Sequence, residues 1–258
     1  MSEEQGKPGC EDCAFYNAAQ LKKLGLSIEN ADMVVALAGN PNTGKSTVFN
    51  ALTGLRQHTG NWPGKTVTRA EGGYQYNDKR IKLIDLPGTY SLLSTSEDEE
   101  VARNFILLGQ PDVTIIVVDA SRLERNLNLV LQVLEITDRA VLCLNLMDEA
   151  KRHNIEVDDR ALAKRLGIPV IPTSARSGEG IPELINTIDH VASGEIQCKP
   201  HRIKNLSPNV EQAVGQMVNA LKSEFPNMPN VRWIAMRLLD GDKRIMEALR
   251  NNELVTLS

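Results

Sequence analysis

Residues Gly39 to Ser46 read G-N-P-N-T-G-K-S and keep the spacing G-x-x-x-x-G-K-[ST]. In this spacing, backbone N–H groups and the start of the following helix face a polyphosphate, and glycines let the chain approach it closely. Lys45 is expected to reach the β- and γ-phosphates, and Ser46 to place its hydroxyl on Mg²⁺. The loop residues that we expect to bind a nucleotide are Gly39, Asn40, Pro41, Asn42, Thr43, Gly44, Lys45, Ser46 and Thr47.

The segments around this loop fit the same interpretation. Residues 33–38 form an almost wholly apolar run, which predicts a buried central strand. Residues 45–52 place Val48, Phe49 and Leu52 on one face of a predicted helix. Strand, glycine loop and helix are the context that this motif requires. The alternative is an ordinary glycine turn that happens to contain Lys-Ser.

A second phosphate-facing segment follows the predicted strand 79–86, which delivers Asp85-Leu86-Pro87-Gly88 in the form D-x-x-G. A carboxylate at that strand end can hold Mg²⁺ through water, and the Gly88 N–H can bond the γ-phosphate. The same tetrapeptide is also common in ordinary turns, so its position after the phosphate loop carries the prediction.

Two further segments select the base. The apolar run 140–146 delivers Asn145, Met147 and Asp148 in the form N-x-x-D. The Asp148 carboxylate can accept two hydrogen bonds from N1–H and N2–H₂ of guanine, a donor pair that adenine lacks. A site built on such bonds rejects the wrong partner by on the order of 10⁴ or more. After the predicted strand 169–172, the backbone of Ser174, Ala175 and Arg176 is expected to face guanine O6.

The order of these four segments resembles the translation-factor-related class of P-loop GTPases over residues 33–194. Residues 58–68 contain Gly-Asn-Trp-Pro-Gly followed by Thr-Val, and residues 85–91 read D-L-P-G-T-Y-S. Both resemble the switch segments of the ferrous-iron transport protein B (FeoB) family. The resemblance implies that Thr66 senses Mg²⁺ and the γ-phosphate, with Thr59 and Thr68 as alternatives. Lys65 departs from the apolar residue usual there.

Many GTPases orient the attacking water with a glutamine after D-x-x-G, but this chain has Thr89 there. Backbone groups, Mg²⁺ and a second cation must then assist hydrolysis. Asn42 matches the asparagine that helps to hold K⁺ in cation-activated GTPases; alternatively, it is there because asparagine tolerates a left-handed backbone. The resemblance implies slow, Mg²⁺-dependent, K⁺-stimulated hydrolysis of GTP to GDP that uses Lys45, Thr66, Gly88 and Asn42.

The elements that must position these segments alternate between strands and helices. This predicts an α/β P-loop GTPase fold, with a mostly parallel central sheet and helices on both faces. A hairpin over 67–86 adds one antiparallel edge strand. We expect an N-terminal extension over 1–32, a GTPase domain over 33–194, a linker over 195–206 and a helical regulatory subdomain over 207–258. Serine at 207 and proline at 208 predict the start of the first of these helices.

Charge and hydropathy narrow the partners. The net charge is −4 and no basic stripe is visible, which argues against nucleic-acid binding. The longest apolar runs have strand length and the N-terminus is polar, so we expect a soluble, cytoplasmic chain with no membrane span or signal peptide. Cys10 and Cys13 form a C-x-x-C that could be half of a metal site or a redox pair, although a flexible tail is the simpler reading. Cys143 lies in an apolar run and is expected to pack in the core.

FeoB proteins continue into a membrane part. The resemblance therefore implies a fragment at the cytoplasmic face of the inner membrane, whose partners are a guanine nucleotide and the membrane transporter domain of the same full-length protein. Homo-oligomers would form through the membrane part. Two alternatives stay open: a ribosome-assembly or RNA-modification GTPase, which would need a basic RNA-binding domain, and a GTP-binding switch without useful hydrolysis.

Overall fold

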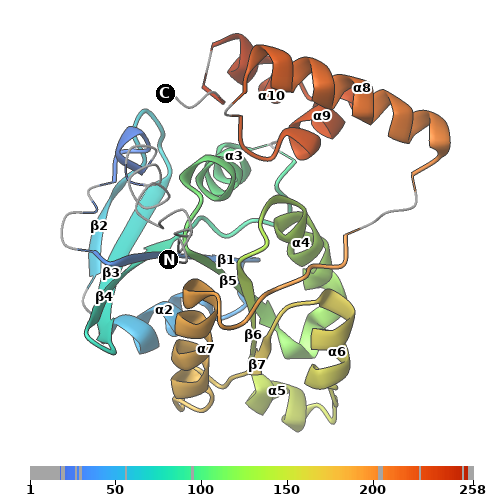
Figure 1. Ribbon diagram of the computed structural model, residues 1–258. Coiled ribbons are helices and arrows are strands. Elements are labelled where there is room, and N and C mark those ends of the chain that lie inside the picture. The colour runs from blue at the N-terminus through green and yellow to red at the C-terminus, as the bar shows by residue number, and fades with distance from the viewer. Residues whose placement is uncertain are drawn as a thin grey trace, which may run out of the picture.

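The sheet at the centre of the molecule has seven strands in the order β2-β3-β4-β1-β5-β6-β7 (Figure 1). The computed structural model describes residues 18, 21–26, 28, 31–55, 57–93, 96–202, 206–226, 228–251 and 253–254. The strands are β1 (Met33–Gly39), β2 (Gln57–Asn61), β3 (Thr68–Tyr76), β4 (Lys79–Asp85), β5 (Val113–Asp119), β6 (Ala140–Asn145) and β7 (Val170–Pro172). Cys10 and Cys13 lie outside the described residues.

The parallel part of the sheet is formed by β4, β1, β5, β6 and β7. Every residue of β1, β5 and β6 is buried, which is the pattern of strands covered on both faces. Side chains alternate between the two layers: Val35 and Leu37 enter one core cluster, and Ala36 and Ala38 the other. The apolar runs in the sequence therefore correspond to the central strands.

β3 pairs antiparallel with β4, as the hairpin pattern predicts. The sheet continues one strand further, because β2 pairs antiparallel with β3 and occupies the edge. β2 has the sequence Q-H-T-G-N, which lacks the apolar alternation of a strand, so only its pairing with β3 reveals it.

Helices cover both faces of the sheet. On one face lie α2 (Lys45–Thr53) and α7 (Ile181–Ser193), whose buried residues share a cluster with Val35 and Leu37. The other face is covered by α3 (Glu97–Asn104), the π-helical turn η1 (Phe105–Gly109) and α4 (Leu123–Ile136). The remaining elements of this part are the 3₁₀ turn η2 (Ala120–Arg122), α5 (Met147–Arg152) and α6 (Asp159–Leu166).

α3 begins with an unusually acidic first turn. The Ser96 hydroxyl accepts a hydrogen bond from the Glu99 N–H at 3.2 Å, and the four residues 97–100 are all acidic. Carboxylates are favoured at this end because the helix dipole is positive there. This acidic turn faces the loop between β2 and β3, as described below.

Three C-terminal helices, α8 (Pro208–Glu224), α9 (Val231–Leu239) and α10 (Lys243–Arg250), lie over α3 (Figure 1). Ile234 and Ile245 are fully buried, and they belong to the same core cluster as Phe105 of η1. The helical part therefore packs on the sheet domain. Pro208 opens α8 as expected, but the side chain of Ser207 makes no cap hydrogen bond there.

Candidate functional site

The phosphate loop connects β1 to α2 at the carboxyl end of the sheet. Gly44 has φ 79°, and a Cβ on it would lie 2.4 Å from Asn145 Nδ2. A Cβ on Gly39 would lie 2.6 Å from the Val117 carbonyl oxygen. Both positions therefore require glycine. Asn42 also has a positive φ of 65°, which asparagine tolerates.

The remaining loop residues line the same turn. Asn40 and Thr43 are buried, and the Thr43 hydroxyl donates to the Asn40 carbonyl oxygen at 2.9 Å. Ser46 and Thr47 lie in the first turn of α2, at its positive end. The loop thus presents Lys45 and the N-terminus of α2, a helix of nine residues. This arrangement suits a polyphosphate.

Lys45 and Asp85 form an ion pair across the ends of α2 and β4. Their side chains are only 12% and 16% exposed. Burial raises the pKa of Asp85, and the charge and hydrogen bond of Lys45 oppose that rise. A mostly buried carboxylate that pairs with Lys45, the residue before Ser46 at the helix start, suits a divalent cation, so Ser46 and Asp85 fit as the residues that would hold Mg²⁺.

The D-x-x-G segment is fixed to the phosphate loop. The Leu86 N–H donates to the Leu37 carbonyl oxygen at 3.0 Å, and the Thr89 N–H donates to the Gly39 carbonyl oxygen at 3.2 Å. A Cβ on Gly88 would lie 3.5 Å from Pro41 Cα, in ordinary van der Waals contact. Thr89 is 4% exposed, so its side chain is buried and does not face solvent.

Asn145 joins the phosphate loop to the two base-selecting segments. Its Nδ2 donates to the Thr43 carbonyl oxygen at 3.0 Å. Its Oδ1 accepts from the Ala175 N–H at 3.1 Å and from the Thr173 hydroxyl at 3.3 Å. Asn145 is 1% exposed, so these are buried bonds in which each amide atom has a partner.

Asp148 lies in the first turn of α5 and is 39% exposed at its side chain. Its carboxylate accepts a hydrogen bond from Arg152 Nη2 at 2.6 Å, one turn later in the same helix. The neighbouring Met147 N–H donates to the Thr173 carbonyl oxygen at 3.2 Å, which fixes the helix start beside the Ser174 segment. Asp148 is thus accessible to a ligand, but its carboxylate already forms an ion pair with Arg152.

The backbone of the Ser174 segment differs from the expected donor set. The Ser174 N–H donates to the Glu179 carbonyl oxygen at 3.0 Å, and the Ala175 N–H donates to Asn145. The Arg176 N–H has no partner among the described residues, and Arg176 is exposed. Of these three N–H groups, that of Arg176 is the one free to meet a base.

The switch loop, residues 62–67 between β2 and β3, does not reach the phosphate loop in this structure. The Thr66 hydroxyl donates to Glu97 Oε2 at 3.1 Å, and Lys65 Nζ pairs with Glu100 Oε2 at 3.1 Å. Both acceptors belong to the acidic first turn of α3. The structure therefore joins Asp85 to Lys45, the neighbour of Ser46 in the chain, and bonds Thr66 to α3 instead. Thr59 and Thr68, the two alternatives, lie within β2 and β3.

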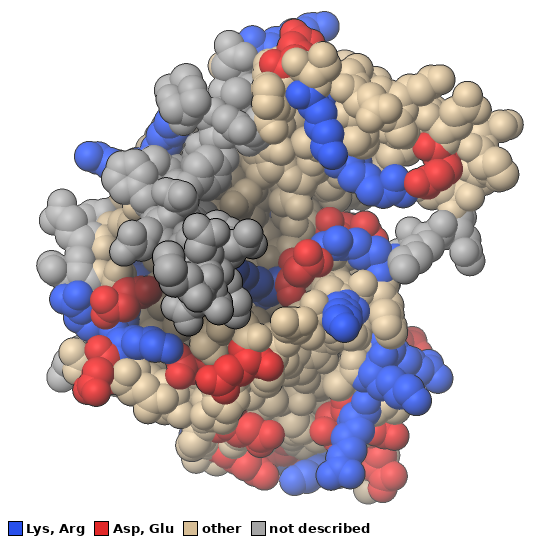
Figure 2. All heavy atoms as spheres, in the orientation of Figure 1, with Lys and Arg blue, Asp and Glu red and all other residues tan. Residues whose placement is uncertain are grey.

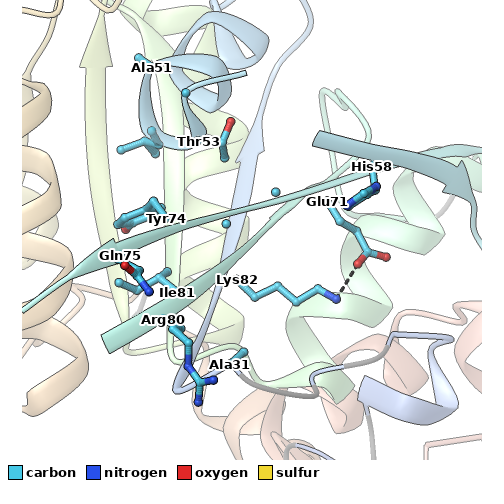
Figure 3. Close-up of a pocket in the computed structure, with 14 residues that line it drawn as sticks. Ala31, Ala51, Thr53, His58, Glu71, Tyr74, Gln75, Arg80, Ile81 and Lys82 are labelled. Carbon is cyan, nitrogen blue, oxygen red and sulfur yellow. Dashed lines mark ion pairs between the residues drawn. The ribbon is translucent and has the colours of Figure 1, made fainter. Parts of the chain in front are cut away.

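A cavity of about 840 Å³ lies elsewhere, between the end of α2 and the strands β3 and β4. Figure 3 shows the side chains that line it, with Glu71 and Lys82 pointing toward each other. None of its lining residues belongs to the phosphate loop. A smaller cavity of about 50 Å³ does touch Asn40, Asn42 and Asp119 beside that loop.

Comparison with known proteins decides the family. A family model described as ferrous iron transport protein B matches residues 33–188, and one described as the FeoB cytosolic helical domain matches residues 207–257. The chain belongs to the ferrous iron transport protein B (FeoB) family. The RNA-related alternative is set aside, because the C-terminal part matches the helical domain of this family and not an RNA-binding domain.

Curated relatives include the Fe(2+) transporters FeoB of Salmonella choleraesuis and Escherichia coli K12, each 42% identical over 81% of this chain. The chain spans 27% of the length of these relatives. Among solved structures, the cytosolic domain of T. maritima FeoB in apo form has a TM-score of 0.76 at 40% identity, covering 88% of both chains. Its GDP form I has a TM-score of 0.75 at 39% identity, covering 88% of this chain and 87% of that one. These FeoB structures confirm the predicted fold class.

Several residues that shape the site were missed from the sequence. Arg152 falls one turn after Asp148, a spacing that could have predicted their ion pair. In the sequence, Glu97 and Glu100 indicate only the start of a helix. Their contacts with the switch loop join residues more than 30 positions apart, so local sequence does not predict them. Thr173 carried no signal of its own, and only the fold brings it to Asn145.

Replacing Asn145 with alanine should weaken both stability and nucleotide binding. The change leaves the Thr43 carbonyl and the Ala175 N–H without buried partners, which lowers the free energy of unfolding by about 2–5 kcal/mol. Guanidinium unfolding measures that loss. The control is Asn186→Ala, which removes an exposed acceptor of the Tyr76 hydroxyl and should change stability by less than about 1 kcal/mol. Equal stability of the two variants would contradict the account of Asn145.

Proposed function

We propose that this chain is a GTP-binding and GTP-hydrolysing cytosolic part of a ferrous-iron membrane transporter, and that it regulates the transporter. The observation that carries the proposal is the pair of hydrogen bonds by which Asn145 joins the phosphate loop at Thr43 to the base-selecting segment at Ala175. A single buried side chain thus sets the distance between a phosphate site and a guanine site. The GDP form of a FeoB cytosolic domain with a TM-score of 0.75 to this chain supports the same conclusion.

Within this proposal, residues 33–194 form the GTPase domain, and residues 207–258 form a helical subdomain that restrains GDP release. Arg103 of α3 offers a link between the two. It is 1% exposed, burial lowers its pKa, and the charge of Asp242 at the start of α10 opposes that effect. α3 is the first helix after the D-x-x-G segment. A displacement of that segment would therefore be transmitted through α3 to the helical subdomain.

The proposed location is the cytoplasmic face of the cell membrane, with the membrane transporter domain of the full-length protein as partner. None of the helices in the described part of the chain has both the length and the apolar composition needed to cross a bilayer. On the face shown in Figure 2, acidic side chains lie beside most of the basic ones. Assembly into homo-oligomers through the membrane part belongs to the same proposal.

The residues would divide the work as follows. Lys45 leaves Asp85 and binds the β- and γ-phosphate oxygens, and the Gly88 N–H donates to the γ-phosphate. Ser46 and Asp85 would hold Mg²⁺, whose positive charge would stabilise the phosphate oxygens. Thr66 joins that group when the switch loop leaves Glu97. Because Thr89 is buried, no side chain at the glutamine position orients water, which agrees with slow hydrolysis.

Base recognition can be tested at Asp148 and Arg152. Asp148→Asn keeps one acceptor oxygen and replaces the other with an NH₂ donor, which would face an N–H donor of guanine, so the GDP affinity measured by calorimetry should fall by on the order of 10³-fold or more. Arg152→Met frees the Asp148 carboxylate from its exposed ion pair, so the same affinity should rise by up to about fivefold. Arg165→Met on α6 is the matched control and should leave the affinity unchanged. Tight GDP binding by the Asp148 variant would rule out the assigned base site.

The role of Asn42 in K⁺ stimulation can be separated from its conformational role. Asn42→Gly keeps the positive φ without strain but removes the side-chain oxygen. If Asn42 holds K⁺, phosphate release by the unmodified chain is faster in KCl than in NaCl, and the glycine variant loses that difference. Equal rates of the unmodified chain in the two salts would remove the K⁺ proposal. A glycine variant that keeps the difference would leave Asn42 with a conformational role alone.

A further inference from the structure

A short segment ahead of the family match packs firmly on the domain. The match begins at residue 33, yet Leu21 and Leu26 are only 1% and 2% exposed and belong to the core cluster. Between them the chain makes a tight turn at Gly25, where φ is 77°, and the Leu26 N–H donates to the Leu21 carbonyl oxygen at 2.9 Å. We call residues 21–26 the N-terminal turn.

The N-terminal turn lies against the start of the switch loop. A Cβ on Gly25 would lie 2.2 Å from Pro63 Cγ, so the Gly25 backbone and the Pro63 ring are in direct contact. The Gly25 carbonyl oxygen accepts a hydrogen bond from Arg69 Nη1 at 2.9 Å. The N-terminal turn therefore contacts Pro63, near the start of the switch loop, and β3, the strand that follows the loop.

Arg69 is held in place by two further groups, the Trp62 ring and the Glu71 carboxylate. Its guanidinium carbon lies 5.5 Å from the centre of the Trp62 ring, and its Nε pairs with Glu71 Oε1 at 2.7 Å. Glu71 in turn pairs with Lys82 at 2.6 Å, as Figure 3 shows. The Arg69 side chain is 15% exposed, so water screens these charges only in part. A fixed Arg69 makes the bond to Gly25 well defined.

Trp62 anchors the start of the switch loop on η1. It is 4% exposed and packs edge to face against Phe105 of η1, with ring centres 5.6 Å apart. The start of the switch loop thus lies between the N-terminal turn and η1. Four residues later, Thr66 bonds to Glu97 of α3. While the start of the loop is fixed in this way, Thr66 stays on α3 and away from Ser46 and Asp85.

We propose that the N-terminal turn is an autoinhibitory clamp that holds the switch loop in the arrangement with Thr66 on Glu97. This inference rests on the proposed function, because the arrangement matters only if Thr66 must reach the γ-phosphate. A ligand shifts a conformational equilibrium only by its differential affinity for the two states. Release of the clamp therefore lowers the net binding free energy of a GTP analogue. GDP lacks the γ-phosphate and binds without releasing the clamp.

The test compares Arg69→Met with Arg80→Met in the full chain. The first variant removes the hydrogen bond to Gly25 together with the contacts of the Arg69 guanidinium with Trp62 and Glu71. The second removes the ion pair of Arg80 with Asp32, which also joins the segment before β1 to the sheet but contacts no switch residue. Loss of one such hydrogen bond corresponds to about a three- to tenfold shift in the loop equilibrium. The affinity for a non-hydrolysable GTP analogue, divided by that for GDP, should rise by that factor in Arg69→Met and stay constant in Arg80→Met.

A second measurement needs no nucleotide. The chain has two tryptophans, so replacing Trp233 with phenylalanine leaves Trp62 as the reporter. Opening of the clamp exposes Trp62, and its quenching constant with acrylamide should rise by about twofold or more in Arg69→Met. Leu21→Ala loosens the turn at its other end, where Leu21 packs beside Gly109 of η1, and it should act in the same direction on both readouts.

The outcomes are distinct. A higher analogue-to-GDP ratio together with greater quenching supports the clamp. An unchanged ratio in protein that binds GDP overturns it, even if quenching rises, because the turn would then only cover apolar surface. Unchanged quenching in both variants also overturns it. Failure of the parent chain to bind either nucleotide would instead refute the proposed function.

Discussion

The amide of Asn145 is the interaction on which the geometry of the site depends. It lies at the end of β6, is almost fully buried, and bonds both to the phosphate loop at Thr43 and to the base-selecting segment at Ala175. Removing one partner from a buried pair leaves the other unsatisfied, so the phosphate site and the guanine site cannot move independently. The nearby Gly44 cannot carry a side chain, because a Cβ would collide with the same amide at 2.4 Å. The phosphate loop, the end of β6 and the Ser174 segment are therefore joined into one unit.

The parts that must move lie on the opposite side of the loop. Asp85 and Lys45 hold each other, and Thr66 and Lys65 are bonded to the acidic start of α3. The contacts of Thr66 and Lys65 are partly exposed and therefore weak. The Lys45–Asp85 pair is mostly buried, and a charged ligand must offer both groups new partners to replace it. Ala102 of α3 and Ile245 of α10 are buried in the same core cluster, which places the helical subdomain within reach of the same movement. A rigid base site beside a replaceable set of ion pairs is what a nucleotide-dependent switch requires.

Local chemistry explains which features could be predicted from the sequence. The phosphate loop, Asp85 and Asn145 follow apolar runs directly, so strand periodicity and glycine spacing were enough to place them. β2 could not be predicted, because its sequence is polar and its hydrogen bonds come from β3. The contact of Thr66 with Glu97 joins residues 31 positions apart, and the packing of Gly25 on Pro63 requires the folded chain. Pairs of this kind leave no periodic signal in a single sequence.

The most direct test of the central claim is a calorimetric titration of the chain with GDP and with ADP under identical conditions. If Asn145 holds a guanine site at the correct distance from the phosphate loop, GDP binds more tightly than ADP by on the order of 10⁴-fold or more. Equal affinity for the two nucleotides would show that the chain reads only the phosphates, and it would contradict the account.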